Sequence, residues 1–192
     1  MTEEEVLAEF RASEALLEGH FKLSSGRHSA HYLQCARVLM DPMRAGRLAS
    51  AIAAKLPREL RSQIDKVVSP AMGGIIIGHE MGRALGTEAI FLERPTGTFE
   101  FRRGFDLKPG EKVLLVEDVV TTGLSSKEAM TAVENAGGIV LALASLVDRT
   151  DADVRFDVPF HPLIQITFPT YADYEVPAQL AAVPVTKPGS RK

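Results

Sequence analysis

Two adjacent carboxylates, Glu117 and Asp118, follow a run of four apolar residues at positions 113–116. An apolar run without polar alternation is typical of a parallel strand that is buried on both faces. In open α/β sheets, ligands bind just outside the carboxyl ends of such strands. We therefore expect the two carboxylates to lie in a ligand site, where their oxygens can accept hydrogen bonds from the hydroxyl groups of a sugar.

The segment that follows the carboxylates, TTGLSS at residues 121–126, is suited to binding a phosphate group. It offers free backbone N–H groups, several hydroxyls and the N-terminus of the helix that the next residues predict. Capping of that helix explains one acid, because Asp and Ser often cap helices, but it leaves the second acid and the paired threonines unexplained. The whole stretch indicates a site for a phosphorylated sugar.

A second strand-to-helix corner, SPAMGG at residues 69–74, is expected at the same edge of the sheet. Glycines there let the backbone approach an anion closely and leave N–H groups free at a helix start. A tight turn that needs small residues explains this segment equally well. Two such corners facing one crevice would suit a ligand with phosphates at both ends.

Arginines occupy two further positions of interest. The connection 95–110 has no helical pattern, which is typical of a functional lid or a disordered loop, and it carries Arg102 and Arg103. Arg149 follows the fourth predicted strand and could bind a carboxylate through its planar guanidinium. The alternatives are a solvated hairpin for the first pair, and a surface ion pair with Asp151 or Asp153 for Arg149.

The elements that must position these residues follow a strand–helix rhythm from residue 66 onward. Such alternation predicts an α/β fold with a doubly wound, mostly parallel sheet. Strands are expected at 66–71, 88–94, 112–118 and 139–147, with a possible fifth at 162–168 and helices at 73–86 and 125–135. The core would then span residues 42–192, with 95–110 as a lid loop and a basic C-terminal tail.

Residues 1–41 do not follow this rhythm and are expected to form a small N-terminal subdomain. A capping box of Thr2 and Glu5 begins a helical stripe that the pattern extends to Gly19. Residues 19–36 then alternate around a turn at Ser25 and Gly26, which predicts a hairpin. The five histidines show no zinc-type spacing, and we expect loop or packing roles for them.

The composition of the chain disfavours several classes of protein. The chain has 192 residues, 45% of them hydrophobic and 24% charged, and a net charge of −3. A negative chain lacks the basic footprint of a protein that binds nucleic acid. Cys35 is the only cysteine, which excludes an internal disulfide and a cysteine-rich metal site. With no apolar signal region or membrane-spanning run, we expect a cytoplasmic enzyme that contacts no membrane.

The stretch VEDVVTTGLSS at residues 116–126 resembles the signature with which type I phosphoribosyltransferases bind 5-phosphoribosyl 1-pyrophosphate (PRPP). Further segments resemble the orotate-specific members of that family: FKLSSGRHSAHY at 21–32, SPAMGGIIIG at 69–78, VDR at 147–149 and the tail KPGSR at 187–191. The resemblance spans nearly the whole chain. It implies a type I phosphoribosyltransferase fold with an N-terminal hood that receives the base. It also implies transfer of the phosphoribosyl group from PRPP to orotate in pyrimidine biosynthesis, giving orotidine 5′-monophosphate and pyrophosphate.

The resemblance also implies roles for individual residues. Catalytic residues would be the lid cations Arg102 and Arg103 with the ribose-binding Glu117 and Asp118. The expected PRPP-binding residues are Met72, Gly73, Arg94, Glu117, Asp118, Val119, Val120, Thr121, Thr122, Gly123, Leu124 and Ser125. The expected orotate-binding residues are Ser24, Tyr32 or its neighbour Leu33, Thr121 and Arg149. The family further implies Mg²⁺ held mainly by substrate, with no metal ligands from the protein, and a homodimer.

This chain departs from the common family pattern at several positions. Many members carry a lysine in place of Ser24, a Tyr–Lys pair in place of Met72 and Gly73, and lysines with a histidine in the lid. Two other readings share the PRPP site. A purine phosphoribosyltransferase is disfavoured because Arg149 suits a carboxylate better than a neutral purine. A PRPP-sensing regulator that binds nucleic acid is disfavoured by the negative net charge.

Overall fold

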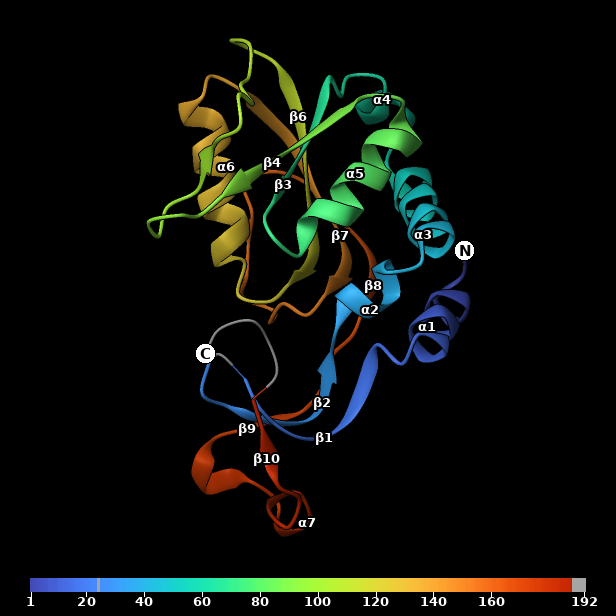
Figure 1. Ribbon diagram of the computed structural model, residues 1–192, viewed down its shortest axis with the longest axis vertical. Helices are drawn as coiled ribbons and strands as arrows, with labels where there is room; N and C mark the ends of the chain where they lie inside the picture. The colour runs from blue at the N-terminus through green and yellow to red at the C-terminus, as the bar shows by residue number, and fades with distance from the viewer. Residues whose placement is uncertain (24, 188–192) are drawn as a thin grey trace.

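The structure is a computed structural model that describes residues 1–23 and 25–187 (Figure 1). Ser24, which was expected to contact orotate, lies outside the described residues, as do positions 188–191 of the tail segment. Among the described residues, no helix is long and apolar enough to cross a membrane.

A six-stranded sheet forms the centre of the molecule, in the order β5-β4-β3-β6-β7-β8. All neighbouring strands are parallel except β5, which pairs antiparallel with β4 at one edge. Their bounds are β3 (Lys66–Pro70), β4 (Glu88–Glu93), β5 (Glu100–Phe101), β6 (Lys112–Val120), β7 (Ile139–Asp148) and β8 (Phe160–Gln165). The predicted doubly wound, mostly parallel sheet is confirmed, and β5 is a short addition inside the expected lid.

Helices cover both faces of this sheet (Figure 1). α3 (Pro42–Lys55) and α5 (Gly74–Leu85) pack on one face, over a core that also receives Val6 and Phe10 of α1 (Glu3–Ala12). α6 (Leu124–Asn135) packs on the opposite face over a second apolar cluster. The short helices α2 (Cys35–Leu39) and α4 (Arg58–Arg61) flank α3 along the chain.

Local sequence signals explain where α3 begins and why the structure corrects the extent of α1. Asp41 caps α3, since its carboxylate accepts from the backbone N–H of Met43 at 2.9 Å. The helical pattern predicted α1 to continue to Gly19, but the helix ends at Ala12. Glu14 adopts a left-handed φ of +49°, and a hydrogen bond of 3.0 Å from the Ala15 N–H to the Phe10 carbonyl closes a Schellman turn. Glycine is the usual residue at that turn, so glutamate gave no stop signal.

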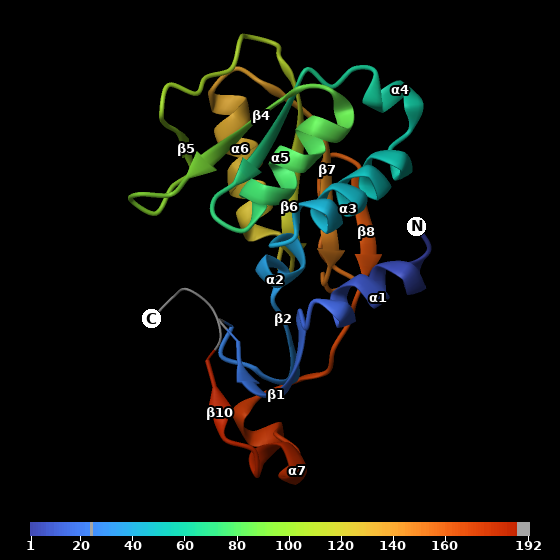
Figure 2. The ribbon, with the colours of Figure 1, turned by 45° about the vertical axis from the view of Figure 1, so that its right-hand side comes forward.

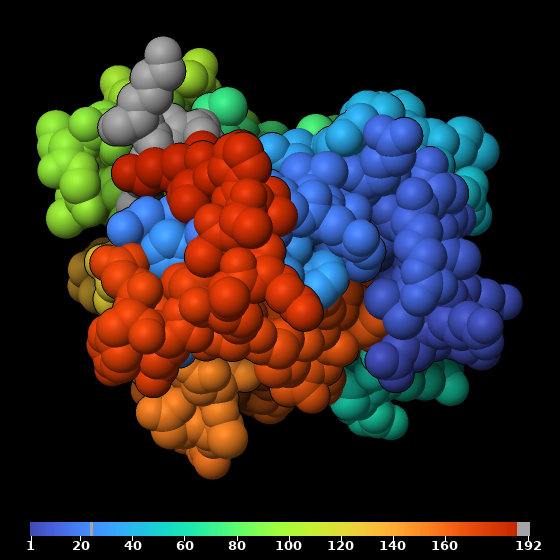
Figure 3. Space-filling view, turned by 90° about the horizontal axis from the view of Figure 1, so that it is seen from below, coloured from blue at the N-terminus to red at the C-terminus, as the bar shows by residue number. Residues whose placement is uncertain are grey.

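A second, four-stranded sheet forms the hood below the first, in the order β10-β1-β2-β9 (Figure 2). β1 (Leu16–Lys22) and β2 (His28–Leu33) form the predicted antiparallel hairpin. The outer strands, β9 (Thr170–Tyr171) and β10 (Val185–Thr186), come from the other end of the chain. Figure 3 shows this C-terminal segment, in red, lying against the blue N-terminal hairpin. The hood sheet therefore joins both ends of the chain, which the sequence pattern did not predict.

A row of hydrogen bonds that passes through two buried histidines links the two ends of the chain. His20 Nδ1 lies 3.0 Å from the Val183 carbonyl oxygen, and its Nε2 lies 2.6 Å from Nδ1 of His28. His28 Nε2 lies 2.7 Å from Oδ1 of Asp173, in the 3₁₀ helix η1 (Asp173–Glu175). The hydrogen bonds from His28 and then Lys22 lower the pKa of the Asp173 carboxyl. The loop roles expected for His20, His28, His31 and His161 were wrong, because all four residues lie in strands.

Replacing His28 with alanine is expected to loosen the C-terminal segment. The change leaves Nε2 of His20 buried without this partner, and an unsatisfied buried polar group costs about 1–3 kcal/mol. For a chain of this size the midpoint of thermal unfolding should fall by roughly 2–10 °C. Circular dichroism melting curves would measure it, with the exposed His79→Ala as control. Equal midpoints for the two variants would contradict this role of the row.

Candidate active site

A hollow of about 430 Å³ opens at the carboxyl ends of β3, β4 and β6. It brings together residues from three separate stretches of the sequence, as the parallel sheet requires. Its lining consists of Pro70, Ala71, Gly73, Arg94, Phe99, Glu117, Asp118, Val119, Val120, Thr121, Thr122, Gly123, Leu124, Ser125 and Ser126. Of the expected PRPP-binding residues, only Met72 is absent from this lining.

The carboxylate pair lies deep in the hollow. Glu117 is 6% exposed, and burial, followed by the nearby charge of Asp118, raises the pKa of its carboxyl well above the usual range. Arg94 opposes this shift. Burial also raises the pKa of Asp118, against the hydrogen bond of 2.9 Å that its Oδ1 accepts from the Val119 N–H. Two neighbouring carboxyls, of which Glu117 is buried and Asp118 is partly exposed, favour a ligand that brings positive charge or hydroxyl donors.

The expected phosphate loop is built where β6 gives way to α6. Gly123 precedes α6 with a left-handed φ of +73°, which glycine adopts without strain. A Cβ at this position would also lie 2.9 Å from Cζ of Phe156. The first intrahelical hydrogen bond runs from the Lys127 N–H to the Gly123 carbonyl at 2.9 Å. The N–H groups between them have no intrahelical acceptor, so they can bind an anion.

The second corner packs directly against the carboxylates. A Cβ added to Gly73 would lie only 2.5 Å from Oδ2 of Asp118, so the site requires glycine there. The Ala71 N–H donates to the Leu92 carbonyl at 2.7 Å, which fixes the corner to β4. Met72 points elsewhere, since its side chain is 84% exposed and does not line the hollow.

Replacing Gly73 with alanine is expected to displace the Asp118 carboxylate and lower kcat/KM about 10²-fold, because a misplacement near 1 Å at a reacting centre has effects of that size. Steady-state kinetics would measure the loss. Gly46→Ala is the matched control, since its added Cβ would meet the flexible end of Arg83, far along a side chain that can move. Equal activity in the two variants would contradict the close packing of Gly73 and Asp118.

Arg94 supplies positive charge to the wall of the hollow. Its guanidinium carbon lies 4.0 Å from the centre of the Phe99 ring, and its Nη2 pairs with Glu128 of α6. Among the described residues, its buried Nε has no hydrogen-bond partner. Phe99 was missed as a site residue, because an aromatic residue in a loop carries no sequence signal for this contact.

The structure does not bring the lid arginines to the hollow. Arg103 Nε donates to Oε1 of Glu93 at 2.7 Å, and Arg102 Nη1 lies 3.8 Å from Oε2 of the same glutamate. Arg103 and Gly104 both have left-handed backbones, with φ of +60° and +77°. The two arginines therefore lie beside the end of β4, away from Glu117 and Asp118.

Of the residues expected to hold the base, Thr121 lines the hollow, whereas Tyr32 and Arg149 do not line it. The Arg149 N–H donates to the carbonyl of Val120, a lining residue, at 2.8 Å. Burial lowers the pKa of Arg149. The pKa of Tyr32 is raised, first by burial and then by the charge of Asp118, while the charge of Arg149 works against this rise. Within the described ranges, no ion pair joins Arg149 to Asp151 or to Asp153. The surface ion pair considered as an alternative role for Arg149 is therefore not seen among these residues.

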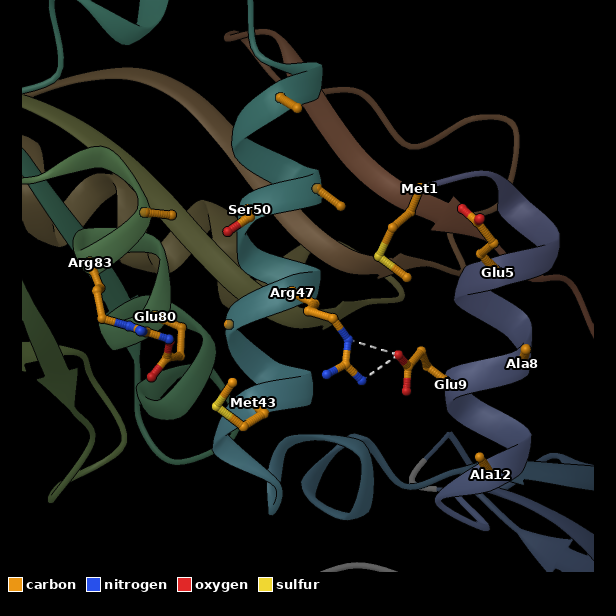
Figure 4. Close-up of a pocket in the computed structure, with 14 residues that line it drawn as sticks. Met1, Glu5, Ala8, Glu9, Ala12, Met43, Arg47, Ser50, Glu80 and Arg83 are labelled. Atoms are coloured by element: carbon orange, nitrogen blue, oxygen red, sulfur yellow. Dashed lines mark hydrogen bonds and ion pairs between the residues drawn. The ribbon is translucent and has the colours of Figure 1, made fainter.

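A larger hollow of about 1000 Å³ lies between α1, α3 and α5 (Figure 4). Figure 4 shows Arg47 bonded to Glu9 on one side and Arg83 beside Glu80 on the other. Four of its charged side chains are already paired with one another, and alanines form much of the remaining wall. It lies away from the carboxyl edge of the sheet, so we locate the candidate site at the smaller hollow.

Comparisons with known proteins agree with the resemblance of the sequence motifs. Residues 39–157 match the family model described as phosphoribosyl transferase domain. The orotate phosphoribosyltransferase of Novosphingobium aromaticivorans is 73% identical over 191 residues, covering 100% of this chain and 98% of that protein. That of Caulobacter vibrioides is 50% identical over 192 residues, covering 100% and 98%.

Solved structures support the fold. The crystal structure of orotate phosphoribosyltransferase from Aeropyrum pernix superposes with a TM-score of 0.70 at 23% identity, over 84% of this chain and 93% of that one. At such identity this match speaks for the fold alone. The domain match and the two full-length relatives go further, and together with the hollow they show that the chain belongs to the orotate phosphoribosyltransferase family.

Proposed function

We propose that this protein transfers the 5-phosphoribosyl group from PRPP to orotate, giving orotidine 5′-monophosphate and pyrophosphate in pyrimidine biosynthesis. One observation carries the proposal: the carboxylate pair and the phosphate loop line a single hollow that adjoins Arg149. Full-length relatives that bear the name of this activity support it.

The residues of the hollow would act mainly through positioning and charge. Breaking the anomeric C–O bond of PRPP places positive charge on the ribose ring and negative charge on pyrophosphate. Glu117 and Asp118 would hold the ribose hydroxyls and counter the ring charge, while 121–125 bind the 5′-phosphate through backbone N–H groups and hydroxyls. Arg94 and the corner at Gly73 would receive the pyrophosphate.

The donor set fits Mg²⁺ as the cofactor. Among the described residues, no group of three or more His, Cys, Asp or Glu side chains could hold a metal ion. Glu117 and Asp118 nevertheless offer two hard oxygen donors beside the expected phosphates, and Mg²⁺ commonly takes few protein ligands and several from phosphates and water. When bound, the ion neutralises the leaving pyrophosphate. The carboxylates would fix the ribose hydroxyls next to it.

The base would bind on the hood side of the hollow. We assign the orotate carboxylate to Arg149, with Thr121 and Tyr32 beside the ring. The lid, 95–110, would close over PRPP and bring Arg102 or Arg103 to the pyrophosphate. The arginine would then leave Glu93, its present partner, and bind the substrate instead. Closure also excludes the water that would otherwise hydrolyse PRPP.

We divide the chain into a hood, residues 1–41, and a core, 42–192, with residues 170–186 completing the hood sheet. We further propose a homodimer, because four large apolar side chains are exposed around the start of α3 and α5. These are Met40 (68% exposed), Met43 (72%), Met72 (84%) and Ile76 (44%). The buried free thiol of Cys35 fits a reducing, cytoplasmic setting, and we propose neither nucleic acid nor membrane as a partner.

Orotate absorbance, followed after adding PRPP and Mg²⁺, tests the activity, with adenine, hypoxanthine and uracil as parallel bases. Loss of orotate that requires both additions is the expected result. Turnover of another base with none for orotate would overturn the assignment of Arg149 and favour a purine or uracil enzyme. PRPP binding without turnover of any base would overturn the enzymatic assignment.

A further inference from the structure

One aromatic side chain lies over the guanidinium of Arg149, on the base side of the site. That side chain is Phe168, whose ring centre lies 5.3 Å from the guanidinium carbon. Among the described residues, no hydrogen bond or ion pair fixes the Arg149 side chain, and its Nε is buried without a partner. Since an arginine side chain has many rotamers, the aromatic face is the feature that holds this guanidinium in place.

Phe168 is itself held from its other side. The His31 ring of β2 stacks on it, with ring centres 4.9 Å apart and an angle of 17° between the planes. The two rings and the Arg149 guanidinium therefore form a row that runs from the hood, through Phe168, to the end of β7.

The backbone around Phe168 is fixed at both ends. The Ile166 N–H donates to the Asp148 carbonyl at 2.9 Å, immediately before Arg149 in the chain. On the other side, the Ser29 hydroxyl donates to the Pro169 carbonyl at 3.3 Å. Thr170 then pairs with Ser29 in the hood sheet. This short connection between β8 and β9 thus places Phe168 between the two sheets with little freedom.

We propose that Phe168 is a positioning residue that sets the affinity for orotate by holding the Arg149 guanidinium toward the base carboxylate. This inference rests on the proposed function and assigns a role to a segment that the PRPP site does not use. Fixing the guanidinium beforehand removes part of the ordering cost of binding. Phe168 contributes equally before and during the reaction, so its loss raises the KM for orotate and leaves kcat nearly unchanged.

Phe168→Leu is the primary test, because leucine keeps an apolar side chain and lacks the aromatic face. The KM for orotate should rise about 5- to 30-fold, as expected for loss of a partly desolvated cation–π contact, while the KM for PRPP stays within about twofold. Phe168→Tyr keeps the ring and should restore the wild-type value. Phe160→Leu is the matched control, since Phe160 packs edge-on against Phe156, a different aromatic partner.

A double-mutant cycle separates positioning from general loosening of the fold. In an Arg149→Gln background, Phe168→Leu should change the orotate KM less than twofold, because the group that it positions is absent. An equal rise in both backgrounds would overturn the inference, as would an unchanged KM in the single variant. Wild-type protein that turns over no orotate would overturn the proposed function and this inference together, whereas wild-type turnover with an unaffected Phe168→Leu variant overturns the inference alone.

Discussion

Replacing Glu117 with glutamine is expected to lower kcat/KM for PRPP by about 10²- to 10³-fold while raising the midpoint of thermal unfolding at neutral pH by roughly 2–4 °C. The activity falls because an amide cannot counter the positive charge that develops on the ribose ring. The stability rises because the variant removes a buried carboxyl that lies beside Asp118 and is only 6% exposed. This one substitution should therefore lower the activity and raise the thermal stability.

The pH dependence of this stability effect has a defined sign. Burial and then the charge of Asp118 raise the pKa of Glu117 in the folded protein, so the folded state binds the proton more tightly than the unfolded chain. The stabilising contribution of the neutral carboxyl is complete below the unfolded pKa and is lost as pH rises through the folded pKa. The advantage of Glu117→Gln should thus be small in acid and grow toward neutral pH.

Melting curves of the wild type and of Glu117→Gln, recorded from acid to neutral pH, would measure the difference. The exposed Glu134→Gln variant, in α6, is the control. The control should follow the wild type in both activity and midpoint. A Glu117→Gln protein that melts below the wild type at neutral pH would show that the carboxyl is stabilising. A kcat/KM close to wild type would remove Glu117 from the reaction.

Replacing Arg103 with alanine is expected to lower kcat about 10²-fold and to change the orotate KM far less. The reason is that pyrophosphate gains negative charge as the anomeric bond breaks, and loss of one donor to such a charge has effects of this size. In the structure Arg103 is paired with Glu93 at 2.7 Å. On the proposed function, Arg103 would act only after the lid had moved it from that glutamate to the substrate.

Two further variants sharpen this test. Arg155→Ala is the control, because Arg155 is exposed and, within the part of the chain that the structure describes, bonds only to backbone carbonyls of its own loop. Glu93→Gln weakens the resting partner of Arg103 and should leave kcat at or above the wild-type value. An Arg103→Ala enzyme with wild-type kcat would contradict the assignment of this lid residue, and so would a strong loss of kcat in Glu93→Gln.

The features that the sequence predicted are those with local causes. The apolar run before Glu117 needs burial on both faces, and it forms the central strand β6. Glycine at 123 marks a left-handed turn that other residues avoid, and the expected turn before α6 forms there. These signals act within a few residues, so pattern and turn chemistry suffice to place them.

The features that the sequence did not predict depend on distant partners. β9 and β10 have two residues each, too short for any periodicity, and they exist because β1 and β2 offer open edges. The contacts of Phe168 with His31 and Arg149 likewise join three separate parts of the chain. The pairing of the lid arginines with Glu93 depends on which conformation the lid adopts, which composition does not determine.

The joining of both chain ends in the hood has a consequence for biosynthesis of the protein. A ribosome completes the phosphate loop and α6 before it makes the segment that carries Phe168, β9 and β10. Most of the six-stranded sheet is therefore made while both edges of the β1–β2 hairpin are still unpaired. A chain that ends before residue 170 would leave both edges of the hairpin without partner strands, and such open edges favour pairing between chains.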